Sequence, residues 1–201
     1  MKIIIITGPT GSGKSRLSNL LFRSLKNAFV LGTDNYYKTG FISNLLSNFI
    51  NAYFDKPISF NKKLFKKDIK KILETKKTSY FLKYDFILKK RIKIFKDISN
   101  IDYLIVEGIF ALEIMKLIEE NDYILIKMQT NKTLCKERAC RRDVIERGKT
   151  QKKALHDFIK AWQIYKRQEE IYKLKEIKDL LYIKKPSDIK KILKKLTTNT
   201  Y

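Results

Sequence analysis

Residues 2–15 read KIIIITGPTGSGKS, an apolar β-branched run followed directly by a glycine-rich segment. The spacing Gly8-x4-Gly13-Lys14-Ser15 is that of a phosphate-binding loop, in which backbone N–H groups converge on an anion and the lysine adds positive charge. The serine hydroxyl is an oxygen ligand of the kind that magnesium prefers. The segment therefore predicts a nucleotide-binding loop, and a glycine-rich turn without a ligand is the alternative.

The residues on either side of this loop have the patterns that phosphate binding requires. Residues 2–7 predict a buried strand, and residues 15–27 place leucines at helical spacing. The order of strand, glycine loop and helix makes a chance match less frequent. We expect the nucleotide phosphates to contact Gly8, Pro9, Thr10, Gly11, Ser12, Gly13, Lys14, Ser15 and Arg16.

Strand-like and helix-like runs alternate along most of the chain. Further buried strands are predicted at residues 28–32, 102–106, 123–128 and 180–183. Helical patterns cover residues 61–77, 111–120, 132–147 and 152–178, and a final amphipathic helix is expected to dock through Ile189, Ile192, Leu193 and Leu196. This alternation predicts an α/β fold, a parallel sheet of the P-loop type with helices on both faces, in one domain over residues 1–201.

Residues 33–100 interrupt the alternation. They contain an irregular stretch, one lysine-rich helix and two β-like runs, residues 79–84 and 91–95, which we expect to pair as a hairpin beside the main sheet. Ligands of open α/β sheets bind beyond the carboxyl ends of the strands. We therefore expect residues 33–100 to cover the site of a phosphate acceptor.

The chain is strongly basic, with a formal net charge of +23. Lysines are spread over the whole chain among many isoleucines and asparagines, and only eight of the 44 basic residues are arginine. This composition is typical of an AT-rich coding sequence, and the alternative is a phosphate-bearing partner such as a nucleic acid. We expect no nucleic-acid partner, and a solvated lysine face on the final helix rather than a membrane anchor.

No apolar window is long enough for a membrane span, and the chain opens in a strand pattern without a targeting segment, so we expect a cytoplasmic protein. Cys135 and Cys140 have no Cys/His neighbours that complete a metal site and are expected to be reduced thiols. His156, the single histidine, is expected at the surface.

Two acidic residues follow predicted strands. Asp34 comes after residues 28–32 in GTDNYYK, and Glu107 ends the next strand in IVEG. Both are expected at the sheet edge where the glycine loop opens. We expect Asp34 to align the attacking hydroxyl and accept its proton, and Ser15, Asp34 and Glu107 to surround magnesium. Solvated carboxylates at turns are the alternative.

Half of the arginines, Arg138, Arg141, Arg142 and Arg147, lie within ten residues in the segment ERACRRDVIERGK. Arginine binds phosphate oxygens in a planar two-pronged geometry that lysine does not reproduce, which favours a phosphate contact. Their spacing excludes one shared helix face, and ion pairs with nearby acidic residues on a solvated helix are the alternative.

In this order, the segments GPTGSGKS, TDNYYK, YFDKPISF, LKYDF, DYLIVEGIFAL and RRDVIERGK resemble the uridine kinases of the P-loop phosphoribulokinase/uridine kinase group. The resemblance covers residues 3 to about 150. It implies magnesium-dependent transfer of the γ-phosphoryl group of ATP or GTP to the 5′-hydroxyl of uridine or cytidine. It also implies a helical lid over residues 131–155 and a homo-oligomer, a tetramer in the family.

The resemblance also implies roles for single residues. Asp34 matches the catalytic aspartate and Glu107 the acid of the magnesium site, while Lys14 neutralises the phosphates. Residues around the acceptor are Tyr37, Asp55, Tyr84, Phe86 and, at a base-reading position, Lys89. Arg142 and Arg147 fall in the lid motif, and Arg142 is also expected to touch the acceptor. Packing of the aromatic residues in a small core is the alternative.

The chain departs from the family pattern at three positions. Lys89 stands where the family usually has a base-reading histidine, Ala139 where it has a second lid arginine, and Lys149 where the lid motif ends in arginine. Lysine donates hydrogen bonds but has no acceptor capacity. These departures leave a kinase for another small hydroxylated metabolite as an alternative, and Ala139 also leaves a nucleotide binder without catalysis. The net charge of +23 leaves a nucleotide-dependent nucleic-acid-binding protein as a further alternative.

Overall fold

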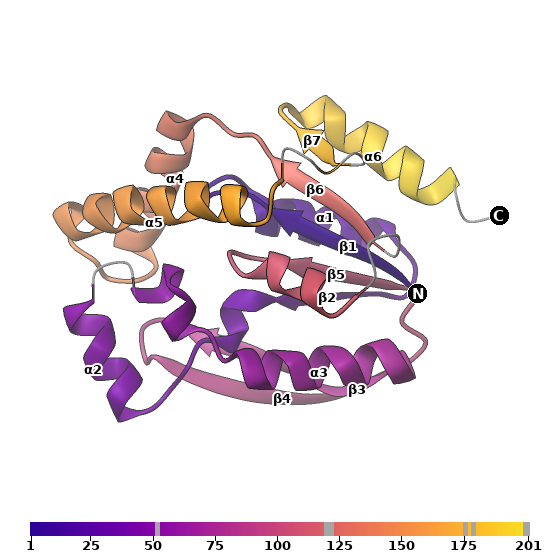
Figure 1. Cartoon of the computed structure of the whole chain (residues 1–201), viewed down its shortest axis with the longest axis horizontal. Helices are drawn as coiled ribbons and strands as arrows, with labels where there is room; N and C mark the ends of the chain where they lie inside the picture. Colours follow the sequence, from indigo (N-terminus) through magenta and orange to yellow (C-terminus); the bar gives the residue numbers. More distant parts are fainter. Residues whose placement is uncertain (51–52, 119–122, 175–176, 178–179, 199–201) are drawn as a thin grey trace.

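The computed structural model describes residues 1–50, 53–118, 123–174, 177 and 180–198, with the backbone alone for Asp55, Pro186, Thr197 and Thr198. Within these residues a parallel five-stranded sheet has the order β2-β5-β1-β6-β7 (Figure 1). Its strands are β1 (Lys2–Thr7), β2 (Ala28–Gly32), β5 (Tyr103–Glu107), β6 (Tyr123–Met128) and β7 (Leu181–Ile183). The predicted α/β fold with a parallel sheet is confirmed.

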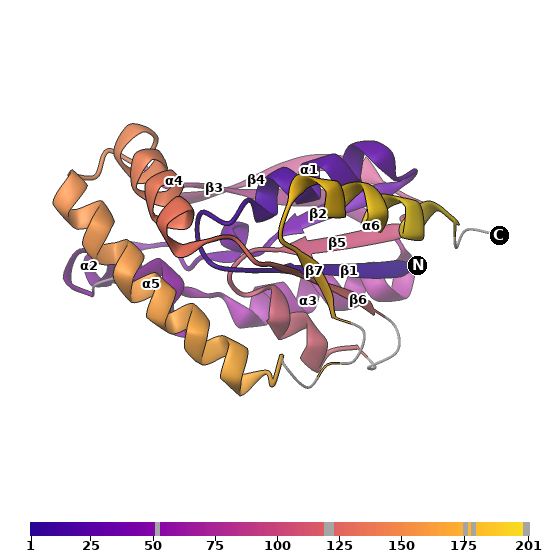
Figure 2. The same ribbon diagram turned by 90° about the horizontal axis from the view of Figure 1, so that it is seen from above.

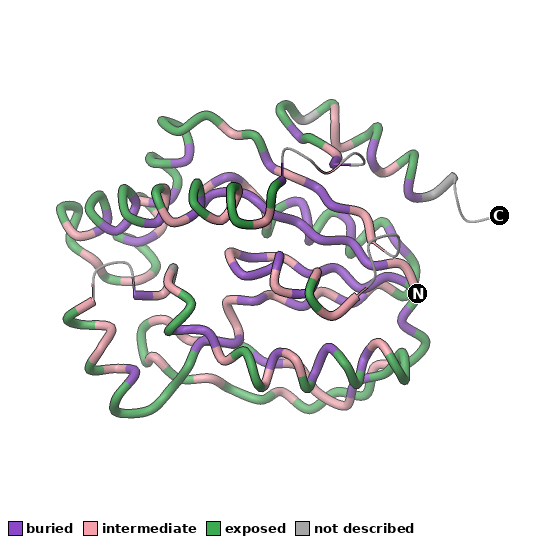
Figure 3. The backbone as a smooth tube through the Cα atoms, viewed as in Figure 1, coloured by how far each residue is buried: buried purple, intermediate pink, exposed green. Residues whose placement is uncertain are grey.

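Strand β1 lies at the centre of the sheet because its isoleucines pack on both faces. Ile4 pairs with Ile105 of β5 and Ile124 of β6 and is fully buried. Alternate residues of the strand enter two separate cores, Ile3 and Ile5 on one face and Ile4 and Ile6 on the other. A continuous apolar run is what a strand covered on both faces requires, and Figure 3 shows the strands of the sheet as the most buried part of the chain.

Helices cover the two faces of the sheet, as Figure 2 shows. On one face lie α1 (Lys14–Ser24) and α6 (Pro186–Thr198), and the expected docking of the final helix is confirmed because Ile192 and Leu196 enter the same core as Leu17 and Leu21. On the other face lie α3 (Lys62–Thr75) and the short 3-10 helix η4 (Ala111–Lys116). The lysine pairs of residues 184–195 are exposed, as expected.

The predicted hairpin is confirmed and is longer than expected. Strands β3 (Thr78–Asp85) and β4 (Lys90–Ile98) pair antiparallel as a separate two-stranded sheet, in which Tyr84 lies opposite Arg91. The hairpin lies alongside α3, at the lower edge of the molecule in Figure 1.

Helix α2 (Phe41–Phe49) differs from the irregular stretch that the sequence predicts at this place. Its apolar residues recur at helical spacing, a pattern that the sequence analysis missed, and their side chains point largely outward, with Phe41 81% and Phe49 77% exposed. The helix lies between the short 3-10 turns η1 (Thr33–Tyr36) and η2 (Tyr53–Asp55), and η3 (Pro57–Ser59) follows.

Several expected helices have different bounds, and α1 ends at Ser24 and α3 at Thr75, each before the predicted end. Residues 111–120 form η4 over their first part, and residues 119–120 lie outside the described residues. Helix α4 (Lys132–Ile145) ends before Arg147, and Gly148 takes a left-handed conformation (φ +64°). Helix α5 (Gln151–Ile171) stops earlier than residue 178 because Lys173 turns left-handed and the N–H of Leu174 returns to the carbonyl of Glu169, a Schellman-type end.

Helices α2, α4 and α5 gather at one end of the sheet, beyond the carboxyl ends of the strands (Figures 1 and 2). Within the described part of the chain, no helix is both long and apolar enough to cross a bilayer.

Candidate active site

The glycine-rich loop joins β1 to α1, and its backbone requires glycine at two points. Gly11 and Gly13 have φ of +77° and +95°, the left-handed region that side chains rarely occupy. At Gly11 a Cβ atom would also overlap the carbonyl oxygen of Cys135 in α4. The loop is therefore packed directly against α4.

Contacts across the loop leave its interior suited to an anion. The ammonium of Lys14 donates to the carbonyls of Gly8 and Pro9, both at 2.9 Å. Thr130, which follows β6, donates to the carbonyl of Ser12 at 2.9 Å and anchors the loop. The hydroxyl of Ser12 is buried without a hydrogen-bond partner among the described residues. A buried unsatisfied donor and a lysine beside backbone N–H groups fit the phosphates of a nucleotide.

Ser15 and Glu107 meet at the start of α1, where the serine hydroxyl donates to the carboxylate at 3.3 Å. Burial, and then the negative charge of Asp34, raise the pKa of Glu107 to about 7, against the lowering effects of Lys14 and Ser15. Burial makes the Glu107 carboxylate costly to ionise, and a cation beside it would offset that cost. This carboxylate and the Ser15 hydroxyl are two oxygen ligands of the kind that a hard cation such as magnesium prefers. No group of three or more Cys, His, Asp or Glu forms a metal cage within the described residues, and magnesium usually completes its shell with water and substrate phosphates.

Asp34 lies on η1, directly after β2, and faces the same edge as Glu107. Gly32 of β2 pairs with Glu107 of β5, so the two acidic residues leave adjacent parallel strands at the same level. The phenol of Tyr37 donates to the Asp34 carboxylate at 3.2 Å. The structure therefore brings Asp34, Glu107, Lys14 and Ser15 together around one cavity, as the sequence predicted.

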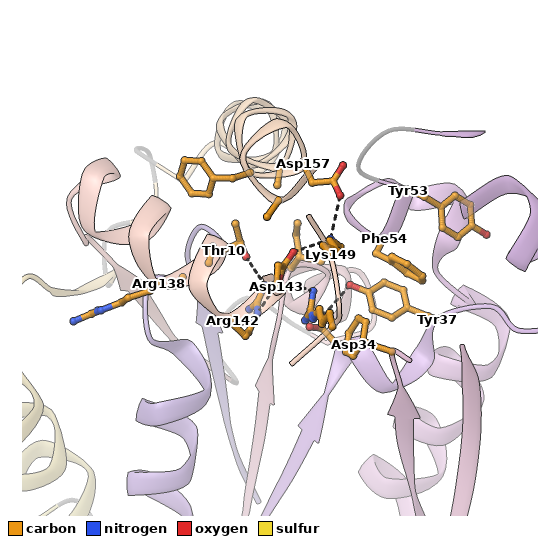
Figure 4. Close-up of a pocket in the computed structure, with 18 of the residues that line it drawn as sticks. Thr10, Asp34, Tyr37, Tyr53, Phe54, Arg138, Arg142, Asp143, Lys149 and Asp157 are labelled. Carbon is orange, nitrogen blue, oxygen red and sulfur yellow. Dashed lines mark hydrogen bonds and ion pairs between the residues drawn. The ribbon is translucent and has the colours of Figure 1, made fainter. Parts of the chain in front are cut away.

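This cavity has a volume of about 670 Å³, a size suited to a small molecule, and is shown in Figure 4. Its walls come from the glycine loop, the segment around α2 with the hairpin turn, and helices α4 and α5. Apart from the loop and the two acids, the wall includes Tyr37, Ser47, Asn48, Tyr53, Phe54, Phe86, Lys89, Arg142, Asp143, Arg147 and Lys149.

Aromatic rings form one wall of the cavity around Tyr37. Its ring makes edge contacts with Phe54 at 5.0 Å and Phe86 at 5.8 Å, measured between ring centres. Tyr84 packs behind Tyr37 at 5.3 Å, is buried and does not line the cavity, so its expected contact with the acceptor is replaced by packing. Phe54 was missed by the sequence analysis, although it stands next to Asp55 in the segment YFDKPISF. The side chain of Asp55 lies outside the described residues.

Three cations converge on the buried carboxylate of Asp143 at the end of α4 (Figure 4). Arg142 donates from Nε at 3.0 Å and from Nη2 at 2.7 Å, and Arg147 and Lys149 approach to 3.3 and 2.7 Å. Burial alone would raise the pKa of Asp143, but the charges of Arg147 and Arg142 and the Lys149 hydrogen bond outweigh it and hold the pKa below its ordinary value. Both arginines thus line the cavity while they are paired to an acid. The two interpretations of the sequence, a phosphate contact and ion pairs with nearby acidic residues, are therefore compatible.

The other arginines of α4 and Ala139 do not contact the Asp143 carboxylate. Arg141 is exposed on α4, and Arg138 reaches the cavity wall but extends away from Asp143 in Figure 4. Ala139 is buried against Cys135 and Phe158, beside the backbone of Gly11. Lys149 also pairs with Asp157 of α5 at 3.1 Å and so links the two helices.

The side chains of the two cysteines and of the histidine do not line the cavity. Cys135 and Cys140 are free thiols, and His156 is exposed on α5 away from the cavity wall.

Comparison with known proteins agrees with this geometry. The model of the phosphoribulokinase/uridine kinase family matches residues 3–167. A uridine kinase from Borrelia turicatae is 32% identical over 163 residues, which cover 79% of this chain and 75% of that protein. A uridine kinase from Alkaliphilus metalliredigens is 34% identical over 157 residues, which cover 77% and 74% of the two chains.

A solved structure shares the fold at low sequence identity. It is that of a possible uridine kinase from Bacillus stearothermophilus, with a TM-score of 0.58 and 15% identity, covering 90% of this chain and 88% of that one.

Proposed function

The chain belongs to the phosphoribulokinase/uridine kinase family and is a P-loop phosphotransferase that acts on a hydroxyl group, and on that premise we propose that it transfers the γ-phosphoryl group of ATP to the 5′-hydroxyl of a pyrimidine ribonucleoside. One observation carries the proposal. Asp34 and Glu107 leave adjacent strands beside Lys14 and Ser15, in a cavity whose other wall is aromatic. The glycine-rich loop for the phosphates, the two carboxylates and an aromatic surface for a base thus line the same cavity.

Each group has a proposed task in the transfer. Asp34 accepts the proton of the attacking hydroxyl, and the phenol of Tyr37 holds its carboxylate in place. Lys14 balances the charge of the β- and γ-phosphates once it leaves the loop carbonyls. Ser15 and Glu107 hold magnesium, which when bound neutralises the phosphate oxygens and orients them for in-line attack. Asp34 would supply a further oxygen ligand to this ion.

The segments around the cavity have proposed roles of their own within one kinase domain over residues 1–201. Residues 33–100 supply the acceptor wall, and residues 131–155 form a lid. In the lid, Arg142 and Arg147 contribute positive charge over the transferred group, which in related chemistry accelerates transfer by about 10³ to 10⁵. In the structure, Nε and Nη2 of Arg142 both donate to one oxygen of Asp143, Oδ1, and the same two donors would be offered to a phosphate oxygen.

The decisive experiment measures ADP release from Mg-ATP with uridine, cytidine and a panel of other small hydroxylated metabolites, with and without added RNA. Acceleration by a pyrimidine nucleoside without RNA supports the proposal. Turnover only with another acceptor would keep the phosphotransferase activity and replace the substrate. A kinase for another small hydroxylated metabolite is the second candidate function because the chain differs from the family pattern at Lys89, Ala139 and Lys149. A requirement for RNA would favour the nucleic-acid-dependent alternative, and ATP binding without any turnover would favour a non-catalytic protein.

We also propose that the protein is a homo-oligomer. Phe41, Ile42 and Phe49 of α2 and Phe95 of β4 are each more than two-thirds exposed and form the kind of surface that a subunit contact covers. Sedimentation velocity measures the state directly, and a monomer at micromolar concentration would contradict it.

A further inference from the structure

Two residues that follow Asp34 in η1 are held by elements outside the five-stranded sheet. The carboxamide oxygen of Asn35 accepts a hydrogen bond from the backbone N–H of Tyr84 in β3, at 3.0 Å. The phenol of Tyr36 donates to the carboxylate of Asp68 in α3, also at 3.0 Å, and both residues are buried. The turn that carries Asp34 is therefore fixed from the side of the hairpin and of α3.

Arg91 of β4 holds the next residue, Tyr37, at its backbone. Its guanidinium donates from Nη1 to the carbonyl of Tyr37 at 2.9 Å. The carbonyl of Tyr36 and the N–H of Lys38 are bonded on the opposite side, to residues 59–61, around an isolated antiparallel bridge. Successive residues of an extended segment alternate in direction, so the carbonyl of Tyr37 faces the hairpin. Because Tyr37 is buried, a charged side-chain donor takes the place of water at this carbonyl.

The guanidinium of Arg91 lies near three phenols. Arg91 is half-buried and lies opposite Tyr84 in the antiparallel register of the hairpin. Burial raises the pKa of the phenols of Tyr36, Tyr80 and Tyr84, and the positive charge of Arg91 lowers it in part. The side chain of Arg91 is therefore directed inward, toward the turn that carries Asp34.

The hairpin is itself held at two points. The carboxylate of Asp68 in α3 also accepts from the phenol of Tyr80 in β3. At the turn of the hairpin, the ammonium of Lys89 donates to Ser47 and Asn48 in the last turn of α2, both at 2.8 Å. Precise placement of a reacting group requires a rigid support of this kind.

Tyr37 connects Arg91 to the proposed proton acceptor. Its carbonyl is bonded to Arg91, and its phenol donates to the carboxylate of Asp34 at 3.2 Å (Figure 4). A proton acceptor works only within hydrogen-bond reach of the hydroxyl that it serves. A shift of the Tyr37 backbone would move the phenol and release the carboxylate from this orientation.

We propose that Arg91 is a positioning residue, which fixes the backbone of Tyr37 and, through the phenol of Tyr37, aims the carboxylate of Asp34 at the attacking hydroxyl. Arg91 does not line the cavity, so it acts on Asp34 without touching the nucleotide or the acceptor. The inference rests on the proposed function and adds to it a residue from outside the cavity. Packing of the hairpin without an effect on Asp34 is the competing interpretation.

The first test compares kcat, the KM for the acceptor and the affinity for Mg-ATP in the wild type, in Arg91→Met and in the control Lys96→Met, which changes an exposed lysine of the same strand. A displacement of about 1 Å costs up to about 10²-fold in rate. We therefore expect Arg91→Met to lower kcat by about 10- to 100-fold, with KM and Mg-ATP affinity within a few-fold of the wild type. Lys96→Met should match the wild type. Arg91→Lys should recover part of kcat, because an ammonium also donates to a carbonyl.

The second test measures whether the effect of Arg91 passes through Asp34. In the Asp34→Asn background, Arg91→Met should lower the residual kcat by less than about threefold, because the carboxylate that Arg91 positions is already absent. A role in packing alone predicts the same fold-loss in both backgrounds. Thermal melting and Mg-ATP binding of each variant establish that it is folded.

The outcomes separate the two proposals. Normal kcat in folded Arg91→Met, or an equal loss in the Asp34→Asn background, overturns the inference and leaves the proposed function intact. If Arg91→Met does not fold, Arg91→Gln takes its place in both tests. A wild type that turns over only another hydroxyl compound overturns the proposed substrate, and the same tests with that compound decide the inference. A wild type without turnover of any acceptor overturns the proposed function and the inference with it.

Discussion

The guanidinium of Arg147 lies 3.7 Å from the centre of the Phe86 ring, so the end of the lid segment rests on the turn of the hairpin. The two residues come from segments that are far apart in sequence, and both line the cavity. Arg147 also pairs with Asp143, at 3.3 Å. One arginine therefore connects the phosphate side of the cavity to its aromatic side.

This contact predicts energetic coupling between the lid and the acceptor wall. A cation–π contact contributes about 0.5–2 kcal/mol, so Phe86→Leu or Arg147→Met alone is expected to raise the KM for the acceptor by roughly 3- to 30-fold. The double variant should lose less than the sum of the two single effects, because each change removes the same contact. Steady-state kinetics of the four proteins measures the coupling, and additive effects would show that the contact has no role in acceptor binding.

Asp34 is predicted to matter for chemistry rather than for nucleotide binding. Asp34→Asn keeps the size of the side chain but removes the proton acceptor, so kcat is expected to fall by about 10² or more while the affinity for Mg-ATP stays within a few-fold. Asp97→Asn, on the exposed part of β4, is the matched control. Near-normal turnover of Asp34→Asn would exclude the proposed role.

The raised pKa of Glu107 predicts that the stability of the metal-free protein depends on pH. Its pKa is about 7 in the folded chain and 4.5 ordinarily, so between these values the folded chain binds more protons than the unfolded chain. The free energy of unfolding therefore falls as pH rises from 4.5 through 7. Glu107→Gln removes this cost, and we expect it to be more stable than the wild type by roughly 1–3 kcal/mol at pH 8, with a smaller difference at pH 5.

Urea unfolding in the presence of a chelator, at both pH values, measures this difference. The same variant should lose turnover, because it lacks the carboxylate proposed for magnesium. A Glu107→Gln protein less stable than the wild type at pH 8 would contradict the buried, destabilising carboxylate.

The approach of Gly11 to α4 predicts a steric effect that can be separated from backbone strain. Gly11→Ala introduces a Cβ against the carbonyl of Cys135, whereas Gly40 also has positive φ (+105°) but no atom within 4 Å of the Cβ that alanine would add there. Both alanine variants lose about 1–3 kcal/mol to the left-handed backbone. Only Gly11→Ala should lose further stability and Mg-ATP affinity, which melting curves and nucleotide titration compare directly. Equal losses of stability and Mg-ATP affinity in the two variants would show that the glycine-rich loop shifts enough to accommodate the added Cβ atom.

Much of the fold was predictable because its elements carry strong local patterns. The bounds of β1, β2 and β6 agree with the predicted runs, because each strand is a short, mainly apolar run; of the three, only the central strand β1 is buried along nearly its whole length. Helix α2 was missed although Phe41, Leu45 and Phe49 stand at helical spacing, and the pattern does not reveal that these side chains remain exposed instead of joining a core. The early end of α5 depends on a left-handed lysine, which the sequence does not mark as glycine would.

The candidate site was predictable in its motif residues and less so in their contacts. Asp34, Glu107, Lys14 and Ser15 meet because parallel strands end at one edge, a relation that sequence order already implies. The packing of Tyr84 behind Tyr37 and the partners of Lys89 depend on how the hairpin folds against α2, which no spacing in the sequence reveals.

The carboxylate of Asp143 is an internal counter-ion for the three cations that surround it. One carboxylate already holds three cations in place and partly removes their hydration, those of Arg142, Arg147 and Lys149. An incoming phosphate therefore replaces the Asp143 carboxylate as their partner and does not have to order free side chains. Part of the charge is neutralised before the nucleotide arrives. Nucleotide affinity should therefore depend less steeply on ionic strength than a chain with net charge +23 suggests.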